Sequence, residues 1–150
     1  SLAGRVADIH NLLPKTKLVI TGEFFLKIDH QLLGVKNTSL ENIKFAISHF
    51  HALAQCRDFM QKQKIKPILG TDTAGSAEDL SKKGSLEVAA IASSLAAEIY
   101  DLKILKKNIQ DAYHNTTRFF LMKEKLEEKK IDNVNYITSF IFKIRNKIIF

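Results

Sequence analysis

Short apolar segments and helix-like segments alternate along most of this chain, and that alternation limits its possible folds more than any other feature. Four apolar runs are expected to be strands: IKFAIS, IKPIL, EVAAIAS and RFFLM, at residues 43–48, 65–69, 87–93 and 118–122. Segments with helical spacing of apolar residues separate them, at residues 49–63, 73–84 and 94–102. Strands that alternate with helices are typical of an α/β fold with mostly parallel pairing.

The chain before the first of these strands is expected to be mixed. A helix is expected over residues 4–13, and a long extended run over residues 17–34. A short helix follows at residues 38–43, where Thr38 and Glu41 have the spacing of a capping box.

The end of the chain changes in character. The charged run EKLEEKK at residues 124–130 reads as a linker, and NYITSFIFKIRNKIIF at residues 135–150 alternates like one strand. A single strand is not stable by itself, so we expect this segment to belong to a structure that continues elsewhere.

Composition and charge exclude several classes of protein. The chain has 150 residues, of which 45% are hydrophobic and 26% charged, the balance of a soluble globular domain. No apolar run approaches the ~20 residues of a membrane helix. The single cysteine, Cys56, excludes an internal disulfide framework and suits a cytoplasmic location. The net charge of +7 fits an anionic small ligand, and no basic stripe with interleaved aromatics argues for nucleic acid.

Two groups of polar residues stand where an expected strand gives way to an expected helix, the usual ligand-binding position in open α/β sheets. Ser48 follows the strand at 43–48 and can cap the next helix, with Gln55 two turns further on. Thr73 lies among the small residues of TDTAGSAED, which allow a ligand to approach the backbone. Spacing alone favours the simpler interpretation of both groups, which is ordinary helix caps and a surface glutamine.

A third polar group precedes the last apolar strand. Asn115, Thr116, Thr117 and Arg118 occur in succession. Arginine suits a planar carboxylate, which it can bind by two parallel hydrogen bonds, and a threonine hydroxyl can donate to a developing leaving oxygen. A strand-edge ion pair is the alternative interpretation of this group.

Metal and cofactor chemistry has little support in the sequence. His49 and His51 form an H-x-H pair, but no second cluster of cysteine, histidine or carboxylate follows at matching spacing. No glycine-rich phosphate loop or nucleophile elbow occurs. We therefore expect no metal and no cofactor.

Six motifs together carry a family resemblance. They are LAGRVADIHNLL, GEFFLKIDHQLLG, SHFHALAQC, TAGSAED, AAIASSLAAEIYDL and NIQDAYHNTTRFFLM. Their order and approximate spacing resemble those of prephenate dehydratase over nearly the whole chain. The triplet Thr117, Arg118 and Phe119 matches the signature of that family. The segment TSFIFKIRN resembles the first strand of the regulatory ACT domain that follows it.

The resemblance implies a two-lobed, periplasmic-binding-protein-like α/β domain with the active site between its lobes. Residues 1–122 would be a partial catalytic domain, with the second lobe at about residues 5–92 and an incomplete first lobe. Residues 123–135 would be a linker, and residues 136–150 the start of the ACT domain.

The resemblance also implies a carbon–oxygen lyase of phenylalanine biosynthesis, in which prephenate loses its ring hydroxyl and carbon dioxide to give phenylpyruvate. Thr117 would donate to the leaving hydroxyl, and Arg118 would hold a carboxylate or brace the threonine. The remaining substrate-binding positions carried over are Ser48, Gln55, Thr73, Asn115 and Phe119. Homo-oligomers are implied for the full-length family, and self-association for this chain.

Two departures from the family pattern limit these expectations. Phe50 and His51 stand where the family usually has proline and glutamine. Of the Glu-Asn-Ser or Glu-Asn-Thr triplet expected before Leu2, only Ser1 is present. We therefore expect slow turnover or none from this chain. We also expect no inhibition by phenylalanine, because the ACT-domain motifs that bind it in the family do not occur in this sequence. The alternative function is a non-catalytic ligand-binding or interaction module derived from the second lobe.

Overall fold

The computed structural model describes residues 12–124 of the chain. Described residues 25–118 form one compact unit, here called the sheet unit, and described residues 12–24 and 119–124 belong to a second. Almost all of the helix expected at 4–13 and of the linker at 123–135, and the whole ACT strand at 136–150, lie outside the described residues.

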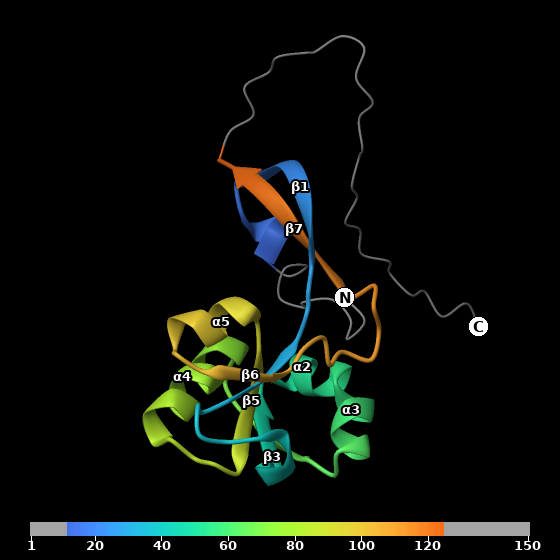
Figure 1. Cartoon of the computed structure of the whole chain (residues 1–150). Coiled ribbons are helices and arrows are strands. Elements are labelled where there is room, and N and C mark those ends of the chain that lie inside the picture. Colours follow the sequence, from blue (N-terminus) through green and yellow to red (C-terminus); the bar gives the residue numbers. More distant parts are fainter. Residues whose placement is uncertain (1–11, 125–150) are drawn as a thin grey trace, which may run out of the picture. The chain divides into compact units, whose positions relative to one another are not determined.

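The sheet unit is built on five strands in the order β4-β3-β5-β2-β6. Figure 1 labels β3, β5 and β6 of this sheet, together with the helices α2 to α5. The strands are β2 (Gln31–Gly34), β3 (Phe45–Ser48), β4 (Lys66–Leu69), β5 (Val88–Ala92) and β6 (Lys103–Lys106). β3 pairs in parallel with both β4 and β5. β2 runs antiparallel to β5 and to β6. The expected α/β class is thus confirmed, with one antiparallel strand inserted into the sheet.

Helices connect these strands. They are α2 (Phe50–Gln55), α3 (Arg57–Lys62), α4 (Thr73–Lys83) and α5 (Ser94–Ile99), with 3-10 turns η1 (Leu13–Lys15) and η2 (Leu40–Asn42). α4 matches its expected range. The Asp72 carboxylate accepts a hydrogen bond from the Gly75 N–H at 2.6 Å at its start, and Gly84 ends it with a left-handed φ of 66°.

The capping box expected at residues 38–43 does not form. η2 has Ser39 as its N-cap, with no side-chain hydrogen bond to the helix. The Thr38 hydroxyl instead donates to the Leu86 carbonyl at 2.6 Å, and Thr38 is buried. The Thr38 hydroxyl therefore makes a long-range hydrogen bond and is not available to cap the local helix.

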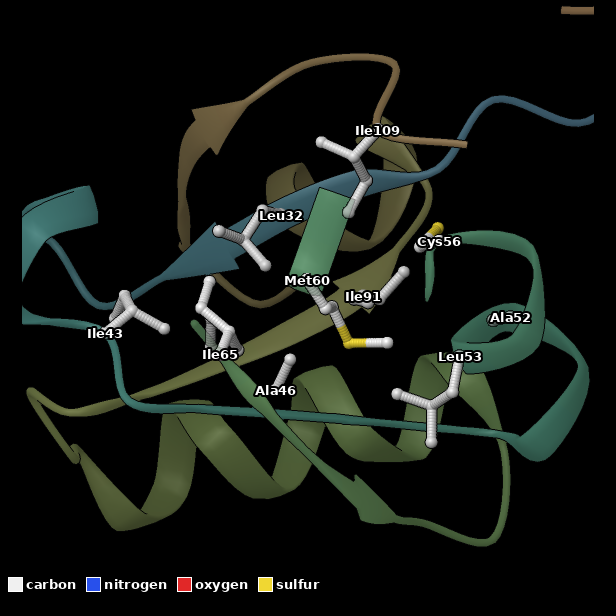
Figure 2. Close-up of a cluster of buried hydrophobic side chains, with 11 residues drawn as sticks. Leu32, Ile43, Ala46, Ala52, Leu53, Cys56, Met60, Ile65, Ile91 and Ile109 are labelled. Carbon is white, nitrogen blue, oxygen red and sulfur yellow. The ribbon is translucent and has the colours of Figure 1, made fainter. Parts of the chain in front are cut away.

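The buried strands supply two cores because successive side chains point to opposite faces of the sheet. Leu32 and Ile91 pack in a cluster with Leu53 of α2 and Met60 of α3 (Figure 2). The neighbouring positions on the same two strands belong to a second cluster, which residues of α4 and α5 complete. The sheet is therefore covered on both faces, which explains why β5 has an unbroken apolar sequence.

The single helix expected over residues 49–63 is wrong, because it breaks at Cys56. Cys56 has a non-helical φ of −119° and ψ of 21°. The Gln55 carbonyl, which a continuous helix would bond to the N–H four residues on, accepts the Asp111 N–H at 2.7 Å. The Asp111 carboxylate also accepts the Asp58 N–H at 3.3 Å, in the first turn of α3. A distant residue thus ends one helix and caps the next.

The sheet unit, at residues 25–118, does not test the bounds of the second lobe expected at about residues 5–92, which stay a prediction. The sheet continues beyond residue 92, because β6 pairs with β2 in the same sheet. The sequence gives this edge strand only four residues, KILK, with both lysines exposed. A pattern of four residues is too short to predict a strand separate from the helix expected at residues 94–102.

A separate two-stranded sheet joins β1 (Val19–Lys27) to β7 (Thr116–Lys123). Its part in the second unit, residues 19–24 and 119–123, is here called the outer ribbon. The apolar strand expected at 118–122 is present but not buried, since Phe119 is 47% and Leu121 58% exposed. A Cβ on Gly22 would lie 3.3 Å from Leu121, so the glycine allows the two strands to pack closely there.

Within residues 12–124, no helix has the length and apolar character that a membrane crossing needs.

Candidate active site

The ends of several strands meet at one edge of the sheet, here called the carboxyl edge. The parallel strands β3, β4 and β5 finish there at Ser48, Leu69 and Ala92. Antiparallel β2 begins there, because its first residue, Gln31, pairs with Ala92. His30 therefore enters the sheet at the edge where open α/β folds bind ligands.

A polar cluster of three side chains, of which two are buried, lies beside this edge. Oε1 of Gln55, at the end of α2, accepts a hydrogen bond from Nδ2 of Asn115 at 2.8 Å. The same oxygen lies 2.7 Å from Nε2 of His30. His30 is 7% exposed and Asn115 1% exposed. We call these three residues the His30–Gln55–Asn115 cluster.

Backbone bonds and a neighbouring glutamine hold His30 in place. The His30 N–H donates to Oε1 of Gln110 at 3.0 Å, and its carbonyl accepts the Ile109 N–H at 2.9 Å. Nε2 of Gln110 in turn donates to Oδ1 of Asp29 at 2.8 Å. The segment after β6 is thereby tied to the segment that leads into β2.

The protonation of the cluster follows from its geometry. An amide oxygen only accepts, so His30 must carry its proton on Nε2 to bond Gln55. Burial lowers the pKa of His30 below the ordinary 6.5, and the hydrogen bond to Gln55 and the charge of Asp29 only partly oppose this. His30 is therefore a neutral donor at neutral pH.

Ser48, expected to cap a helix, does not do so. The N-cap of α2 is His49, whose Nδ1 accepts the His51 N–H at 3.3 Å. The Ser48 hydroxyl is fully buried and donates to the Ile91 carbonyl at 2.6 Å, which links the ends of β3 and β5. The Ser48 hydroxyl oxygen can therefore still accept a hydrogen bond, but it has no proton left to donate.

The other expected site residues have varied surroundings. Thr73 is half-buried as the first residue of α4. Thr117 is half-buried near the start of β7. Arg118 is exposed, and its guanidinium carbon lies 5.9 Å from the centre of the Phe25 ring. Phe119 belongs to the outer ribbon. The structure thus joins Gln55 directly to Asn115, while the convergence of the whole set remains a prediction.

Metal ligation finds no geometric support in the described residues. His49 and His51 are in contact, with ring centres 5.2 Å apart. Within residues 12–124, however, no three histidine, cysteine, aspartate or glutamate side chains gather as a metal site would require.

His30 is the residue that sequence reasoning missed. It lies inside the motif GEFFLKIDHQLLG, directly before a strand whose four residues are all buried. A polar residue directly before a fully buried strand is a signal that could have identified a candidate site residue. The side chains that His30 bonds, Gln55 and Gln110, are 25 and 80 positions away in sequence, so no local pattern reveals them.

The sheet and the helices that cover it define an α/β domain. The family model for prephenate dehydratase matches residues 1–127. The chain therefore belongs to the prephenate dehydratase family, as the six motifs predict.

Named relatives agree with this family. The chain is 40% identical over 147 residues to a bifunctional N-acyl-homoserine lactone acylase/prephenate dehydratase of Komagataeibacter europaeus, covering 98% of this chain and 52% of that protein. It is 38% identical over 144 residues to arogenate dehydratase/prephenate dehydratase 1 of Arabidopsis thaliana, covering 96% and 36%. The chain thus spans about half or less of the length of these relatives.

Solved structures agree as well. Prephenate dehydratase from Arthrobacter aurescens, in complex with L-Phe, matches with a TM-score of 0.73 and 30% identity, over 81% of this chain and 42% of that one. Prephenate dehydratase from Staphylococcus aureus matches with a TM-score of 0.71 and 26% identity, over 85% and 47%. These matches confirm the mixed α/β fold.

Proposed function

We propose that this chain contributes to a prephenate dehydratase, in phenylalanine biosynthesis. In that reaction prephenate takes up one proton and releases water and carbon dioxide, and the ring becomes aromatic as phenylpyruvate forms. The gain of aromaticity supplies much of the driving force. The protein then has to hold two carboxylates and help a hydroxyl to leave.

One observation carries this proposal. Gln55 and Asn115 are both substrate-binding positions by family resemblance, and they lie 2.8 Å apart although 60 positions separate them in sequence. Asn115 directly precedes the Thr-Thr-Arg segment. The cluster therefore fixes the start of that segment beside the carboxyl edge.

The chemistry of each proposed residue follows from its surroundings. Both donors to Gln55 use its oxygen, so only Nε2 of Gln55 is left to donate to a substrate carboxylate. Thr117 would donate its hydroxyl proton in a hydrogen bond to the leaving oxygen. Arg118 would bind a carboxylate by two hydrogen bonds. Ser48, Thr73 and Phe119 are the remaining proposed contacts.

A turnover assay with a matched pair of variants tests this function. The chain is extended upstream by a segment of a relative that ends in Glu-Asn, and phenylpyruvate formation from prephenate is followed. Thr117→Val keeps the shape of the side chain but removes the hydroxyl. Loss of one such donor should lower kcat by about 100- to 1,000-fold.

Two controls locate the effect. Thr116→Val changes the neighbouring residue in the same way and should leave kcat within about threefold, as for a residue outside the reacting groups. Thr117→Ser retains the hydroxyl and should keep most of the activity. Equal losses from Thr116→Val and Thr117→Val would reject the proposed role. Tight binding of prephenate with no turnover in the extended chain would favour the non-catalytic module instead.

A second candidate is hydrolysis of an N-acyl-homoserine lactone amide. It is favoured by the 40% identity to the bifunctional acylase and by the likeness to a structure described as a quorum-quenching acylase, at a TM-score of 0.73 and 43% identity. The surroundings of the two possible nucleophiles argue against amide hydrolysis. Ser48 is buried and bonded to a carbonyl, and burial raises the pKa of Cys56 to about 12. Release of fatty acid from such a lactone would support it.

A further inference from the structure

Two segments near the carboxyl edge are attached through backbone hydrogen bonds to residues of the His30–Gln55–Asn115 cluster. The Ile28 N–H donates to the Asn115 carbonyl at 2.8 Å, just before His30 on the segment that enters β2. The Asp111 N–H donates to the Gln55 carbonyl at 2.7 Å, on the segment that leads to Asn115. The His30–Gln55–Asn115 cluster therefore lies where the entering and leaving segments are both attached to the end of α2.

The two bonds to Gln55 fix the orientation of the Asn115 amide. Because Oε1 of Gln55 only accepts, the atom of Asn115 that contacts it must be the donor Nδ2. The His30 donor on the same oxygen holds Gln55 from a second direction. Without His30, Gln55 would lose one of the two contacts that set its rotamer.

The opposite atom of Asn115, Oδ1, has no donor among the described residues. Oδ1 is buried and accepts no hydrogen bond from any group within residues 12–124. A buried carbonyl oxygen in that state is unfavourable and rare, so it calls for an explanation. A hydroxyl or ammonium group of a ligand could supply the missing donor, whereas a carboxylate could not.

We propose that His30 is a positioning residue, which acts through Gln55 to hold Asn115 so that its Oδ1 can accept a hydrogen bond from a ligand hydroxyl. The ligand part rests on the proposed function, because prephenate carries such a hydroxyl on its ring. His30 itself touches no substrate in this scheme. It sets the orientation of an amide that lies two residues before Thr117.

Two variants of His30 separate positioning from general packing. His30→Gln can place an amide N–H near the position of Nε2 and so keep a donor to Gln55. His30→Phe keeps a ring of similar size and removes the donor. The first readout is hydrogen exchange of the Asn115 side-chain amide, followed by NMR in the 150-residue chain.

We expect the Asn115 Nδ2 protons to exchange about five- to tenfold faster in His30→Phe than in the parent, as for loss of one hydrogen bond that braces the donor's partner. His30→Gln should stay within about twofold of the parent, because the donor is kept. Exchange of the backbone amides of β5 serves as the control for an intact fold. Unchanged Asn115 exchange in a folded His30→Phe would overturn the proposal.

Gln55→Met provides a second route should His30→Phe not fold. Gln55 is half-buried at the end of α2, and methionine keeps its length without an acceptor. Gln55→Met should release the Asn115 amide, and adding His30→Leu, which removes the donor, should then have no further effect on Asn115. A further effect of His30→Leu in that background would show that His30 acts by another path, and would overturn the proposal.

The dissociation constant of prephenate is the second readout. We expect His30→Phe to weaken binding by about five- to tenfold and His30→Gln to restore it. Equal affinity in parent and His30→Phe would overturn the proposal. If the parent binds no prephenate, the proposed function fails for this chain, and the exchange of the Asn115 amide still decides whether His30 positions it.

Discussion

The sheet unit and the outer ribbon differ in how far their apolar side chains are buried. Leu32 and Ile91 of the sheet unit are fully buried, with helices on both faces of the sheet. Phe24 and Leu121 of the outer ribbon are 57% and 58% exposed. Two strands alone have little stability in water, whereas five strands covered by helices can bury a core. We infer that the sheet unit provides the stability and that the ribbon adds little.

The largest expected effect is a core truncation. Leu32→Ala should lower the free energy of unfolding by about 2–5 kcal/mol, because it removes a fully buried side chain and leaves a cavity. Leu121→Ala in the outer ribbon should change it by only about 0.5 kcal/mol. Urea denaturation of both variants measures the difference. Similar losses from the two would contradict the inferred division of stability.

The reactivity of thiols sharpens the same comparison. Burial first, and then the charge of Asp111, raises the pKa of Cys56 from 9.0 to about 12, which lowers its thiolate fraction at neutral pH about a thousandfold. In Leu121→Cys, reaction with a disulfide reagent should therefore have one fast and one very slow phase. Two fast phases in folded protein would show that the α2–α3 side of the sheet opens readily.

A smaller loss of stability is expected when the N-terminal cap of α4 is removed. Asp72→Ala removes the carboxylate that accepts the Gly75 N–H and should cost about 0.5–2 kcal/mol of stability. Thr21→Ala is the matched change in the outer ribbon, where the hydroxyl bonds the Leu121 carbonyl at 3.3 Å. It should have almost no effect on denaturation. A larger loss from Thr21→Ala would assign stability to the ribbon.

The smallest expected effect is on the pH dependence. Burial lowers the pKa of His30, so below its ordinary pKa of 6.5 the unfolded chain binds a proton that the folded chain does not. The contribution of His30 to the free energy of unfolding should therefore increase as the pH rises to about 6.5. The same contribution should decrease as the pH drops towards the lowered pKa. His30→Gln should flatten that part of the curve. An unchanged slope in thermal unfolding would place His30 in water rather than in the cluster.

The sequence predicted those elements whose signals are local. α4 was expected over 73–84 because the chain has small and polar residues at its start and Gly84 at its end. β5 was expected from its unbroken apolar run. The break at Cys56 was not predictable, because it depends on Asp111, which lies 55 positions away.

The same distinction holds for the candidate site. Gln55 and Asn115 were selected by their positions beside expected strands and helices, and the family motifs then implied a substrate-binding role for both. Their contact, and the part that His30 plays in it, depends on three segments that meet only in the folded sheet unit. Ser48 was assigned to the correct edge but to the wrong bond, since spacing alone does not show whether a serine caps a helix or joins two strand ends.

The central claim is that the His30–Gln55–Asn115 cluster and Thr117 form part of a prephenate site at the carboxyl edge. Titration of the ¹⁵N-labelled chain with prephenate, followed by NMR, tests it most directly. We predict that the side-chain amides of Gln55 and Asn115 and the backbone amide of Thr117 shift together, with one dissociation constant. The sheet unit also has an open groove of about 500 Å³, lined by residues that include Lys36, Tyr100 and Asp101. Shifts confined to that groove, with Gln55, Asn115 and Thr117 unmoved, would contradict the claim.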